Sequence, residues 1–548
     1  MTSRSSTLWS RSVRWFFCGI ATMCQGITPA EAQQSEQLQK QVEQLKQEFE
    51  NTTQEYQATT QALSLRIATL EQQIQTEKEA AAENKAGTIS AAELAAQQAT
   101  QAVMGDSNQV GAKFQGQIPS EPTYDHLREA DRKIAKLQEQ VGSFEFHGYF
   151  RSGYALNSKG GQQVAFQAPG AEAKYRLGNE AETYGEFIFV DNWVNPNQSP
   201  EKAWAKTEVM IEANTSNSTS YASFPNGIGN DQFRLREAFV QIGNVSDFQP
   251  HARFWAGERY YRRQHIDIND FYPLDLSGYG GGVEDVDVRV GKLAVAFLSG
   301  ARPDIVTQSG TLAKSNIDVR LSDVKGPPIR GIPSGLWSAW FDYATSKGGT
   351  TSAGTVVPTT DGYAFGLKHE LLEWYGGYHS FSVQYGTGAA SNFSSNGSGT
   401  VIPNPTPFID ESAQLLITEQ VVYQPNDRFA IMPIFLYQQT KDGDPAHRWN
   451  QWESFGARPE LFFTKYLSLA VEGGFDHTNS PGKYDGWLRK VTVSPQIGAG
   501  RKFFSRPVLR TYLTYANWSD GFRGMVGGVP YENKTKALTY GIQTETWW

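Results

Sequence analysis

Cysteine is nearly absent from this chain. Its 548 residues include 2 cysteines, and both lie near the N-terminus, at Cys18 and Cys24. We interpret residues 1–32 as a secretory signal peptide, because arginines precede the apolar run WFFCGIATMC and the AEA tripeptide at 30–32 fits a small-x-small cleavage site. The mature chain would then contain no thiol, which excludes disulfides and thiol chemistry.

Long apolar runs and clustered positive charge are also missing. No run of about 18 apolar residues follows position 32, so we expect no membrane-spanning helix in the mature chain. The formal net charge is −8 and no basic stripe is visible, so nucleic acid is not an expected partner. Aromatic residues, by contrast, are plentiful at 13%. A membrane protein that lacks spanning helices has to be a closed β-barrel.

Residues 33–83 contain no proline or glycine and are rich in glutamine, glutamate and lysine. At both ends of this stretch the apolar residues recur at spacings of four and three, and Thr52 and Thr59 occupy seam positions in the middle, which predicts the seam of a periplasmic coiled coil with polar middle layers. A single solvated helix is the alternative, but it would leave the seam leucines with nothing to pack against. The seam residues are Leu38, Val42, Leu45, Phe49, Tyr56, Leu63, Ile67, Leu70 and Ile74.

Residues 84–143 continue this extension in three parts. An alanine-rich stretch predicts a helix at 86–105, and residues 106–123 carry glycine, proline and serine and are interpreted as a linker. We expect the coiled coil to make the protein an oligomer, and the polar middle layers of the first seam favour a homotrimer. A second short seam follows the linker, at Leu127, Ala130, Ile134, Leu137 and Val141.

From residue 144 to residue 548 the pattern changes to a period of two, with turn residues between the segments. In the stretch FHGYFRSGY, Phe146, Phe150 and Tyr154 share one face of a strand, and Tyr149 and Arg151 share the other. Aromatic residues outside and polar residues inside suit a barrel with lipid around it and a polar lumen. We therefore predict an all-β transmembrane barrel of 16–18 antiparallel strands. A soluble multi-domain β-protein is the alternative.

The barrel segment resembles the maltoporins, the trimeric sugar-specific porins of the Gram-negative outer membrane. The matching strings are FHGYFRSG (146–153), FQAPGAEAKYRLGNEAETY (166–184), FRLREAFVQ (233–241), FWAGERYYRRQHIDINDFYPLDLSGYGGGVEDVDV (254–288), SRPVLRTYLTYANW (505–518) and ETWW (545–548). The resemblance implies an 18-stranded barrel whose third loop folds inward to form a constriction. The N-terminal coiled coil is instead similar to the sucrose porins, which carry such an extension into the periplasm.

The resemblance also implies a line of lumen aromatics, the greasy slide. Sugars expose C–H groups on their ring faces, and several weak stacking contacts in a row let an oligosaccharide move without leaving the wall. Alternatively, these rings belong to the aromatic girdle at the membrane interface, or they only fill space inside the barrel. Carried over by motif or by looser alignment, the slide residues are Tyr149, Tyr184, Tyr378, Phe504 and Trp547.

A polar track is the second implied element, because sugar hydroxyls need hydrogen-bond donors and acceptors facing each other across the pore. Tyr272 would be the constricting side chain. The alternative is that these charges only solvate the lumen or pin the loop to the wall, and Asp270 is the residue we most suspect of pinning. The implied track residues are Arg151, Arg176, Glu186, Arg236, Arg263, Asp270 and Asp275.

The constriction and the extension point to different branches of the family. Sucrose porins lack the matching arginine, tyrosine and aspartate, whereas Arg263, Tyr272 and Asp275 are all present here. His265 stands where the family has an acidic residue, which removes one acceptor. The solute class is therefore expected to be oligosaccharides, either maltodextrin-like or sucrose-like, taken up by facilitated diffusion.

The sequence leaves three alternatives to a sugar-specific porin. An enzyme is disfavoured, since no nucleophile motif or metal-spaced histidine cluster is visible, and we expect neither cofactor nor metal. The glycines of Gly278-x-Gly280-x-Gly282 are interpreted as a turn rather than a phosphate loop. A general diffusion porin would lack the continuous aromatic line. A trimeric tether, whose coiled coil contacts the cell wall or a periplasmic partner, is compatible with a porin.

Overall fold

The computed structural model describes residues 144–195, 202–215, 232–326, 334–394, 399–403 and 405–548. The predicted signal peptide, both coiled-coil seams and the linker, all within residues 1–143, lie outside the described residues. No helix in the described part of the chain is long and apolar enough to cross a membrane.

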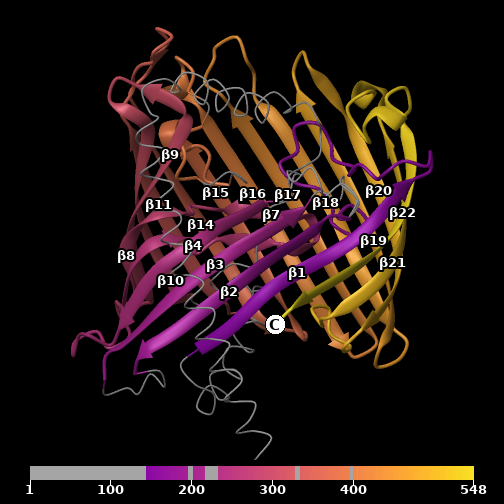
Figure 1. Ribbon diagram of the computed structural model, residues 1–548, viewed down its shortest axis with the longest axis horizontal. Helices are drawn as coiled ribbons and strands as arrows, with labels where there is room; N and C mark the ends of the chain where they lie inside the picture. The colour runs from indigo at the N-terminus through magenta and orange to yellow at the C-terminus, as the bar shows by residue number, and fades with distance from the viewer. Residues whose placement is uncertain (1–143, 196–201, 216–231, 327–333, 395–398, 404) are drawn as a thin grey trace, which may run out of the picture. The chain divides into compact units, whose positions relative to one another are not determined.

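Eighteen antiparallel strands form one closed sheet. Each strand pairs with the next along the chain, and β22 (Lys536–Trp547) closes the barrel by pairing with β1 (Phe144–Asn157). Figure 1 shows this closure where the yellow C-terminal strand meets the indigo N-terminal one. The strand number confirms the predicted barrel and lies at the upper end of the predicted range.

The remaining barrel strands are β2 (Thr183–Val194), β3 (Trp204–Thr215), β4 (Gln232–Gly243), β5 (Arg253–Arg259), β8 (Gly278–Asp287), β9 (Lys292–Thr307), β10 (Gly310–Lys325), β11 (Leu336–Ser346), β14 (Thr360–Trp374), β15 (Gly377–Thr387), β16 (Ala413–Asn426), β17 (Phe429–Lys441), β18 (Asn450–Phe462), β19 (Leu467–Ser480), β20 (Tyr484–Gly498) and β21 (Val508–Trp518). The loops add β6 (Gln264–Ile266), β7 (Phe271–Leu274), β12 (Gly349–Thr350), β13 (Val356–Val357), η2 (Asp267–Asn269), η3 (Gly388–Ala390), η4 (Ile409–Glu411), η5 (Asp520–Phe522) and η6 (Val529–Tyr531).

Alternation along the strands separates an apolar outer face from a polar inner face. On β1, Phe146 and Tyr154 are exposed on the outer face, whereas Tyr149 and Arg151 are buried inside. The other strands repeat the pattern, because successive side chains of a strand point to opposite sides of the sheet. The exposed outer residues include Phe297, Ile317, Phe341, Phe365, Phe381, Phe435, Phe455, Val491, Leu513 and Tyr540.

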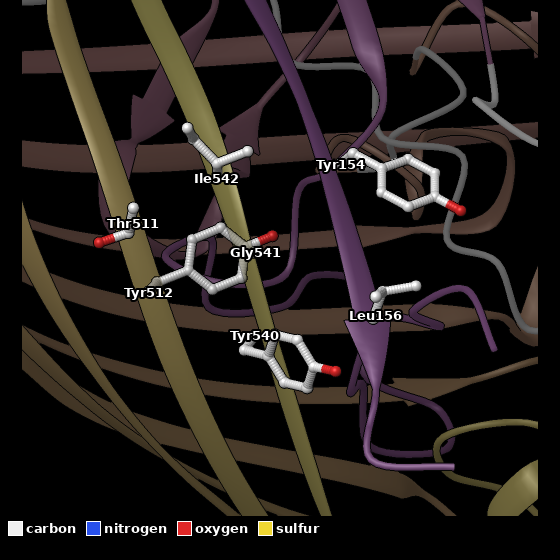
Figure 2. A pocket seen from close by; sticks show the side chains of 7 residues that line it. All are labelled: Tyr154, Leu156, Thr511, Tyr512, Tyr540, Gly541 and Ile542. Atoms are coloured by element: carbon white, nitrogen blue, oxygen red, sulfur yellow. The ribbon is translucent and has the colours of Figure 1, made fainter. Parts of the chain in front are cut away.

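A shallow apolar hollow of about 370 Å³ lies in the wall where β1, β21 and β22 meet. Figure 2 shows Tyr154, Tyr540 and Ile542 around it, with Gly541 at its centre. A side chain at Gly541 would come within 2.6 Å of the Tyr154 carbonyl oxygen, so glycine lets β22 approach β1 closely at this point.

The interpretation of Gly278, Gly280 and Gly282 as a turn is wrong. All three residues lie within strand β8. A Cβ atom added at Gly280 would sit 1.9 Å from the carbonyl oxygen of Phe297 on β9, and one at Gly282 would sit 2.5 Å from that of Val295. The glycines therefore serve close packing of two strands, a role that glycine can also have inside a strand pattern.

The lumen is filled in part by loops 158–182 and 260–277 and by the described residues between β15 and β16, which are 388–394, 399–403 and 405–412. We call residues 260–277 the inserted loop, because its side chains and backbone contact inward-facing residues of strands on several sides of the barrel. Phe271 packs edge-on against Trp452 of β18 at 5.2 Å, and the Pro273 carbonyl accepts a hydrogen bond from Gln384 of β15. This loop and loop 158–182 carry many of the predicted site residues.

Candidate functional site

Strand register brings the first group of predicted residues together. Tyr149 of β1 lies directly opposite Trp547 of β22. Arg151 lies opposite Glu545 on β22 and opposite Tyr184 on β2. Side chains of directly opposed residues share one face of an antiparallel pair, so these five side chains all point into the lumen.

The aromatic residues of this wall form a continuous line of ring contacts. Tyr184 and Tyr149 have centroids 6.1 Å apart, and Tyr149 and Trp547 stack at 6.4 Å. Trp547 lies 6.4 Å from Phe504, which in turn meets Phe503 edge-on at 4.8 Å. The line therefore runs from β2 across β1 and β22 to the turn between β20 and β21. Tyr149 and Tyr184 are buried, and Trp547 and Phe504 are half-buried.

Glu545 is the acidic centre beside this line. Its Oε2 accepts hydrogen bonds from Arg506 Nε at 2.8 Å and from Arg510 Nη2 at 2.7 Å. Its Oε1 accepts one from the Tyr149 hydroxyl at 3.0 Å. The Arg506 guanidinium also lies 4.2 Å above the Trp547 ring, so an arginine and an aromatic face are combined at this end of the line.

Arg176 links loop 158–182 to two other parts of the molecule. Its Nη2 donates to Glu545 at 2.9 Å, and its Nη1 lies 3.3 Å from Asp267 of the inserted loop. Its Nε donates to Glu180 at 3.0 Å within its own loop. Asp267 is also 3.5 Å from Arg458 of β18. One buried ion-pair network thus joins the wall and both loops.

Arg151 is completely buried beside the aromatic line. Its Nη2 donates to Glu182 at 2.6 Å, and its guanidinium lies 4.8 Å from the Tyr184 ring. Glu182 is in loop 158–182, where burial would raise the pKa of its carboxyl but the Arg151 charge lowers it below the ordinary value. Arg151 is therefore held by a charged partner as well as by an aromatic ring.

The inserted loop is hydrogen-bonded to Phe393 and Gly399, in the segment between β15 and β16, and to the wall. The Asp275 N–H donates to the Phe393 carbonyl at 2.8 Å, and the Gly399 N–H donates back to the Asp275 carbonyl at 2.7 Å. Gln384 of β15 donates to the Pro273 carbonyl at 2.9 Å. These three hydrogen bonds fix the backbone of the loop at Pro273 and Asp275.

Aromatic and charged groups converge at the centre of the inserted loop. The Arg263 guanidinium lies 3.6 Å from the Tyr260 ring centroid and 4.7 Å from that of Tyr272. His265 stacks on Tyr272 at 4.7 Å with an interplanar angle of 28°. Arg263 Nη1 is 3.8 Å from Asp275 Oδ2. Arg263, Tyr272 and Asp275, singled out together in the sequence, are therefore neighbours.

Asp270 lies in the same loop but makes a local contact. Its Oδ1 is 3.0 Å from His265 Nε2, and the residue adopts a left-handed backbone with φ 54° as it ends η2. The His265 carbonyl accepts a hydrogen bond from Gln420 of β16 at 3.2 Å. The contact of Asp270 with His265 is therefore within the loop, and its suspected role in pinning the loop to the wall stays a prediction.

The remaining polar residues lie on β2 to β4. Glu186 accepts a hydrogen bond from the Tyr184 hydroxyl at 2.6 Å. Arg236 forms an ion pair with Glu212 of β3. The β3–β4 pairing shifts register between Met210 and Ile211, so Arg236 sits at a bulge and reaches Glu212 from there.

Tyr378 stands apart from the other predicted slide residues. It is buried on β15, where its hydroxyl donates to Gln420 at 3.3 Å. Its place on a different stretch of wall agrees with its looser alignment in the sequence. The structure thus brings four of the five proposed slide residues into one line and places Tyr378 elsewhere.

The sequence reasoning missed Tyr260, Phe503 and Arg506. Tyr260 belongs to the string FWAGERYYRRQ and Arg506 to SRPVLR, but the resemblance implies no role for either residue. Their neighbours are far away in the chain, and no local pattern shows that Arg506 would cover Trp547. A rule that pairs each unassigned arginine with the inward aromatics would have found it.

Ion pairs keep Asp267 and Arg263 of the inserted loop in their charged forms. Burial would raise the pKa of Asp267, but Arg176 and Arg458 outweigh this effect and hold the pKa below its ordinary value. Burial would lower the pKa of Arg263, whereas Asp275 raises it, so the guanidinium stays protonated. Within the described ranges, no group of three or more His, Cys, Asp or Glu residues could hold a metal ion.

Comparison with known families decides the identity of the barrel. A family model described as LamB porin matches residues 144–548. The chain belongs to the LamB porin family. LamB porins are channels of the outer membrane, so this LamB-family chain is an outer-membrane porin and not an enzyme. The expected resemblance to maltoporins is confirmed for the barrel segment.

Two solved porin structures are similar to this LamB-family chain at low identity. An anion-selective porin from Comamonas acidovorans is 10% identical, with 74% of this chain and 99% of that chain covered and a TM-score of 0.35. OccAB4 of Acinetobacter baumannii is 11% identical, with 75% and 100% covered and a TM-score of 0.38. At these values the likeness says nothing about the solute.

Proposed function

We propose that this porin is carbohydrate-selective and allows facilitated diffusion of oligosaccharides. The observation that carries the proposal is the unbroken line of ring contacts from Tyr184 through Tyr149 and Trp547 to Phe504. A sugar ring has an apolar face and a rim of hydroxyls. A row of aromatic rings can therefore bind it weakly at successive positions, and weak multi-site binding is what conduction requires.

The charged groups beside the line supply the second half of the recognition. Arg151, Arg176 and Arg506 offer fixed forks of N–H donors, and Glu186 and Glu545 offer acceptors. These donors and acceptors come from β1, β2, β22, loop 158–182 and the turn between β20 and β21, and they lie beside the aromatic faces. This arrangement matches a ligand whose hydroxyls both donate and accept hydrogen bonds, and it favours sugars over a solute of one charge.

The wider organisation belongs to the same proposal. We infer a homotrimer in the outer membrane, with residues 33–143 in the periplasm as a coiled-coil extension that contacts the cell wall or a periplasmic protein. The family consists of oligomeric channels, and the seam spacing of residues 33–83 favours a trimer.

Liposome swelling tests the selectivity. The purified protein is reconstituted and swelling rates are compared for sucrose, maltose and maltotriose, and for a neutral amino acid smaller than any of them. A sugar-selective channel passes maltotriose faster than its size predicts. Rates that fall smoothly with solute mass, whatever the chemistry, would mean a general diffusion porin and would remove the role of the aromatic line.

A Trp547→Ala variant and a Tyr540→Ala variant sharpen the test, because both residues lie on β22 and point to opposite faces of the wall. Only the inward Trp547 variant should lose the preference for maltotriose. Equal loss in both variants would indicate damage to the barrel rather than to sugar binding.

A further inference from the structure

The inserted loop contains a column of four stacked side chains that the slide does not explain. In spatial order they are Tyr260, Arg263, Tyr272 and His265, with successive centre distances of 3.6, 4.7 and 4.7 Å. All four side chains are buried. Two of them, Tyr260 and His265, have no role in the proposed oligosaccharide transport. The role inferred for them rests on that proposed function.

The shortest contact defines the orientation of the arginine. A guanidinium carbon 3.6 Å from a ring centroid has to lie over the ring face, in van der Waals contact and nearly parallel to it. The N–H groups of a guanidinium lie in its plane. A stacked arginine therefore keeps its donors directed sideways, and the ring fixes the plane in which they point.

The loop backbone holds Tyr260 in place from both sides. The Tyr260 N–H donates to Glu237 Oε1 of β4 at 2.8 Å, and the Arg262 carbonyl accepts from Arg320 Nη1 of β10 at 2.7 Å. Between them, Tyr261 packs into the wall against Trp255 at 5.2 Å and against the Arg320 guanidinium at 4.7 Å. The two adjacent tyrosines thus diverge, Tyr261 into the wall and Tyr260 onto Arg263.

The other end of the column is held within the loop. His265 stacks on Tyr272, its Nε2 lies 3.0 Å from Asp270 Oδ1, and its carbonyl accepts from Gln420 of β16 at 3.2 Å. An acidic side chain at position 265 could not form this aromatic stack. The histidine therefore changes the packing around Tyr272 as well as the number of acceptors.

We propose that Tyr260 and His265 are positioning residues that determine the solute specificity of the channel, by holding Arg263 and Tyr272 in one column. The column fixes the plane of the Arg263 donors, and Asp275 lies at 3.8 Å beside them as an acceptor. Paired in-plane N–H groups fit two adjacent hydroxyl oxygens of a sugar, because their spacing resembles that of the two oxygens of a carboxylate, which arginine binds through both N–H groups.

Two substitutions at position 260 separate the ring from the hydroxyl. Tyr260→Phe keeps the π face over Arg263, and Tyr260→Leu removes it with a modest change in volume. We expect Tyr260→Leu to weaken sugar block of the ion current by about tenfold, equal to about 1.4 kcal/mol, and Tyr260→Phe to match the wild type. The readouts are the maltotriose concentration at half block and the K⁺/Cl⁻ permeability ratio in planar bilayers.

A double-mutant cycle shows whether Tyr260 acts through the arginine. If it does, Tyr260→Leu should have little further effect in an Arg263→Gln background. A purely structural role would give the same loss in both backgrounds and would overturn the proposal. His265→Ala disturbs the other end of the column and should weaken sugar block by about threefold. This variant tests the proposal if Tyr260→Leu does not assemble.

The outcomes distinguish this proposal from the sugar function. If no sugar blocks the wild type, the proposed function fails, and the column is then tested by the K⁺/Cl⁻ ratio, which Tyr260→Leu should alter and Tyr260→Phe should not. If sugar blocks the wild type and Tyr260→Leu leaves both readouts unchanged, the column proposal is wrong and the sugar function stands. Tyr343→Leu, on the outer face of β11, is the matched control.

Discussion

Two regions of the lumen combine aromatic rings with arginines, and they are built in different ways. The aromatic line from Tyr184 to Phe504 lies mainly on barrel strands, whose hydrogen-bonded register sets each side chain opposite its neighbour. The column from Tyr260 to His265 lies on the inserted loop, which is held by ion pairs and by a few hydrogen bonds rather than by a continuous strand register. The geometry of the aromatic line should therefore tolerate substitutions around it. The geometry of the column should depend on the ion pairs and hydrogen bonds that hold the inserted loop.

The largest effect is expected where the two regions are joined. Glu545→Gln removes the carboxylate that faces Arg176, Arg506 and Arg510, and breaking a buried charge pair costs about 3–5 kcal/mol. We expect a lower free energy of unfolding in detergent and a shift of ion selectivity toward anions. Glu453→Gln, a half-exposed carboxylate on β18, should change neither. An unchanged stability in Glu545→Gln would mean that the network does not join the regions.

The next effect belongs to the aromatic line alone. Replacing both Tyr184 and Trp547 with alanine removes two stacking surfaces of about 1 kcal/mol each, so sugar affinity should fall roughly 30-fold. Ion conductance should stay similar or rise, because the pore becomes wider. The measurement is sugar block of the ion current. Unchanged affinity would exclude the aromatic line as the path of the sugar.

Acid should affect the inserted loop before it affects the aromatic line. The pKa of Asp267 is held below its ordinary value of 3.8 by Arg176 and Arg458, so its ion pairs stabilise the loop above that pH. This stabilisation is lost as the pH falls through the lowered pKa of Asp267. Current recordings should become noisier in that range.

Asp267→Asn provides the check on the acid effect. The variant should show the noisier current already at neutral pH and should lose the further change on acidification. If the wild type and the variant respond to acid identically, the ion pairs of Asp267 do not stabilise the inserted loop.

The smallest effect is expected outside both regions. Deletion of residues 33–143 should leave a folded, conducting trimer, because the barrel closes on itself through β1 and β22 without them. Conductance and the apparent mass in detergent check this. Loss of the trimer would show that the coiled coil is needed for assembly.

The difference between the regions also decided what could be predicted from the sequence. Strand residues such as Tyr149, Arg151 and Trp547 could be assigned to the inner face, because a period of two determines the face of every residue in a strand. The pairing partners could not be assigned, since register depends on contacts across hundreds of residues. The ring contact between Tyr149 and Trp547 is an example.

Loop residues were predictable only through the family resemblance. Arg263, Tyr272 and Asp275 were singled out by motif, and they do lie together. Tyr260, which is closest to Arg263, was missed because two adjacent tyrosines in a loop give no sign of which one points to the wall. The glycines of β8 were misassigned for a related reason, since glycine serves turns and close strand packing alike.

Single-channel conductance of the purified protein, titrated separately with maltohexaose and with sucrose, tests the central claim most directly. The aromatic line predicts a saturable block by maltohexaose at low concentration, weakened in the Trp547→Ala variant and unchanged in Tyr540→Ala. A current unaffected by either sugar would contradict the claim and would leave a porin whose lumen aromatics only fill space.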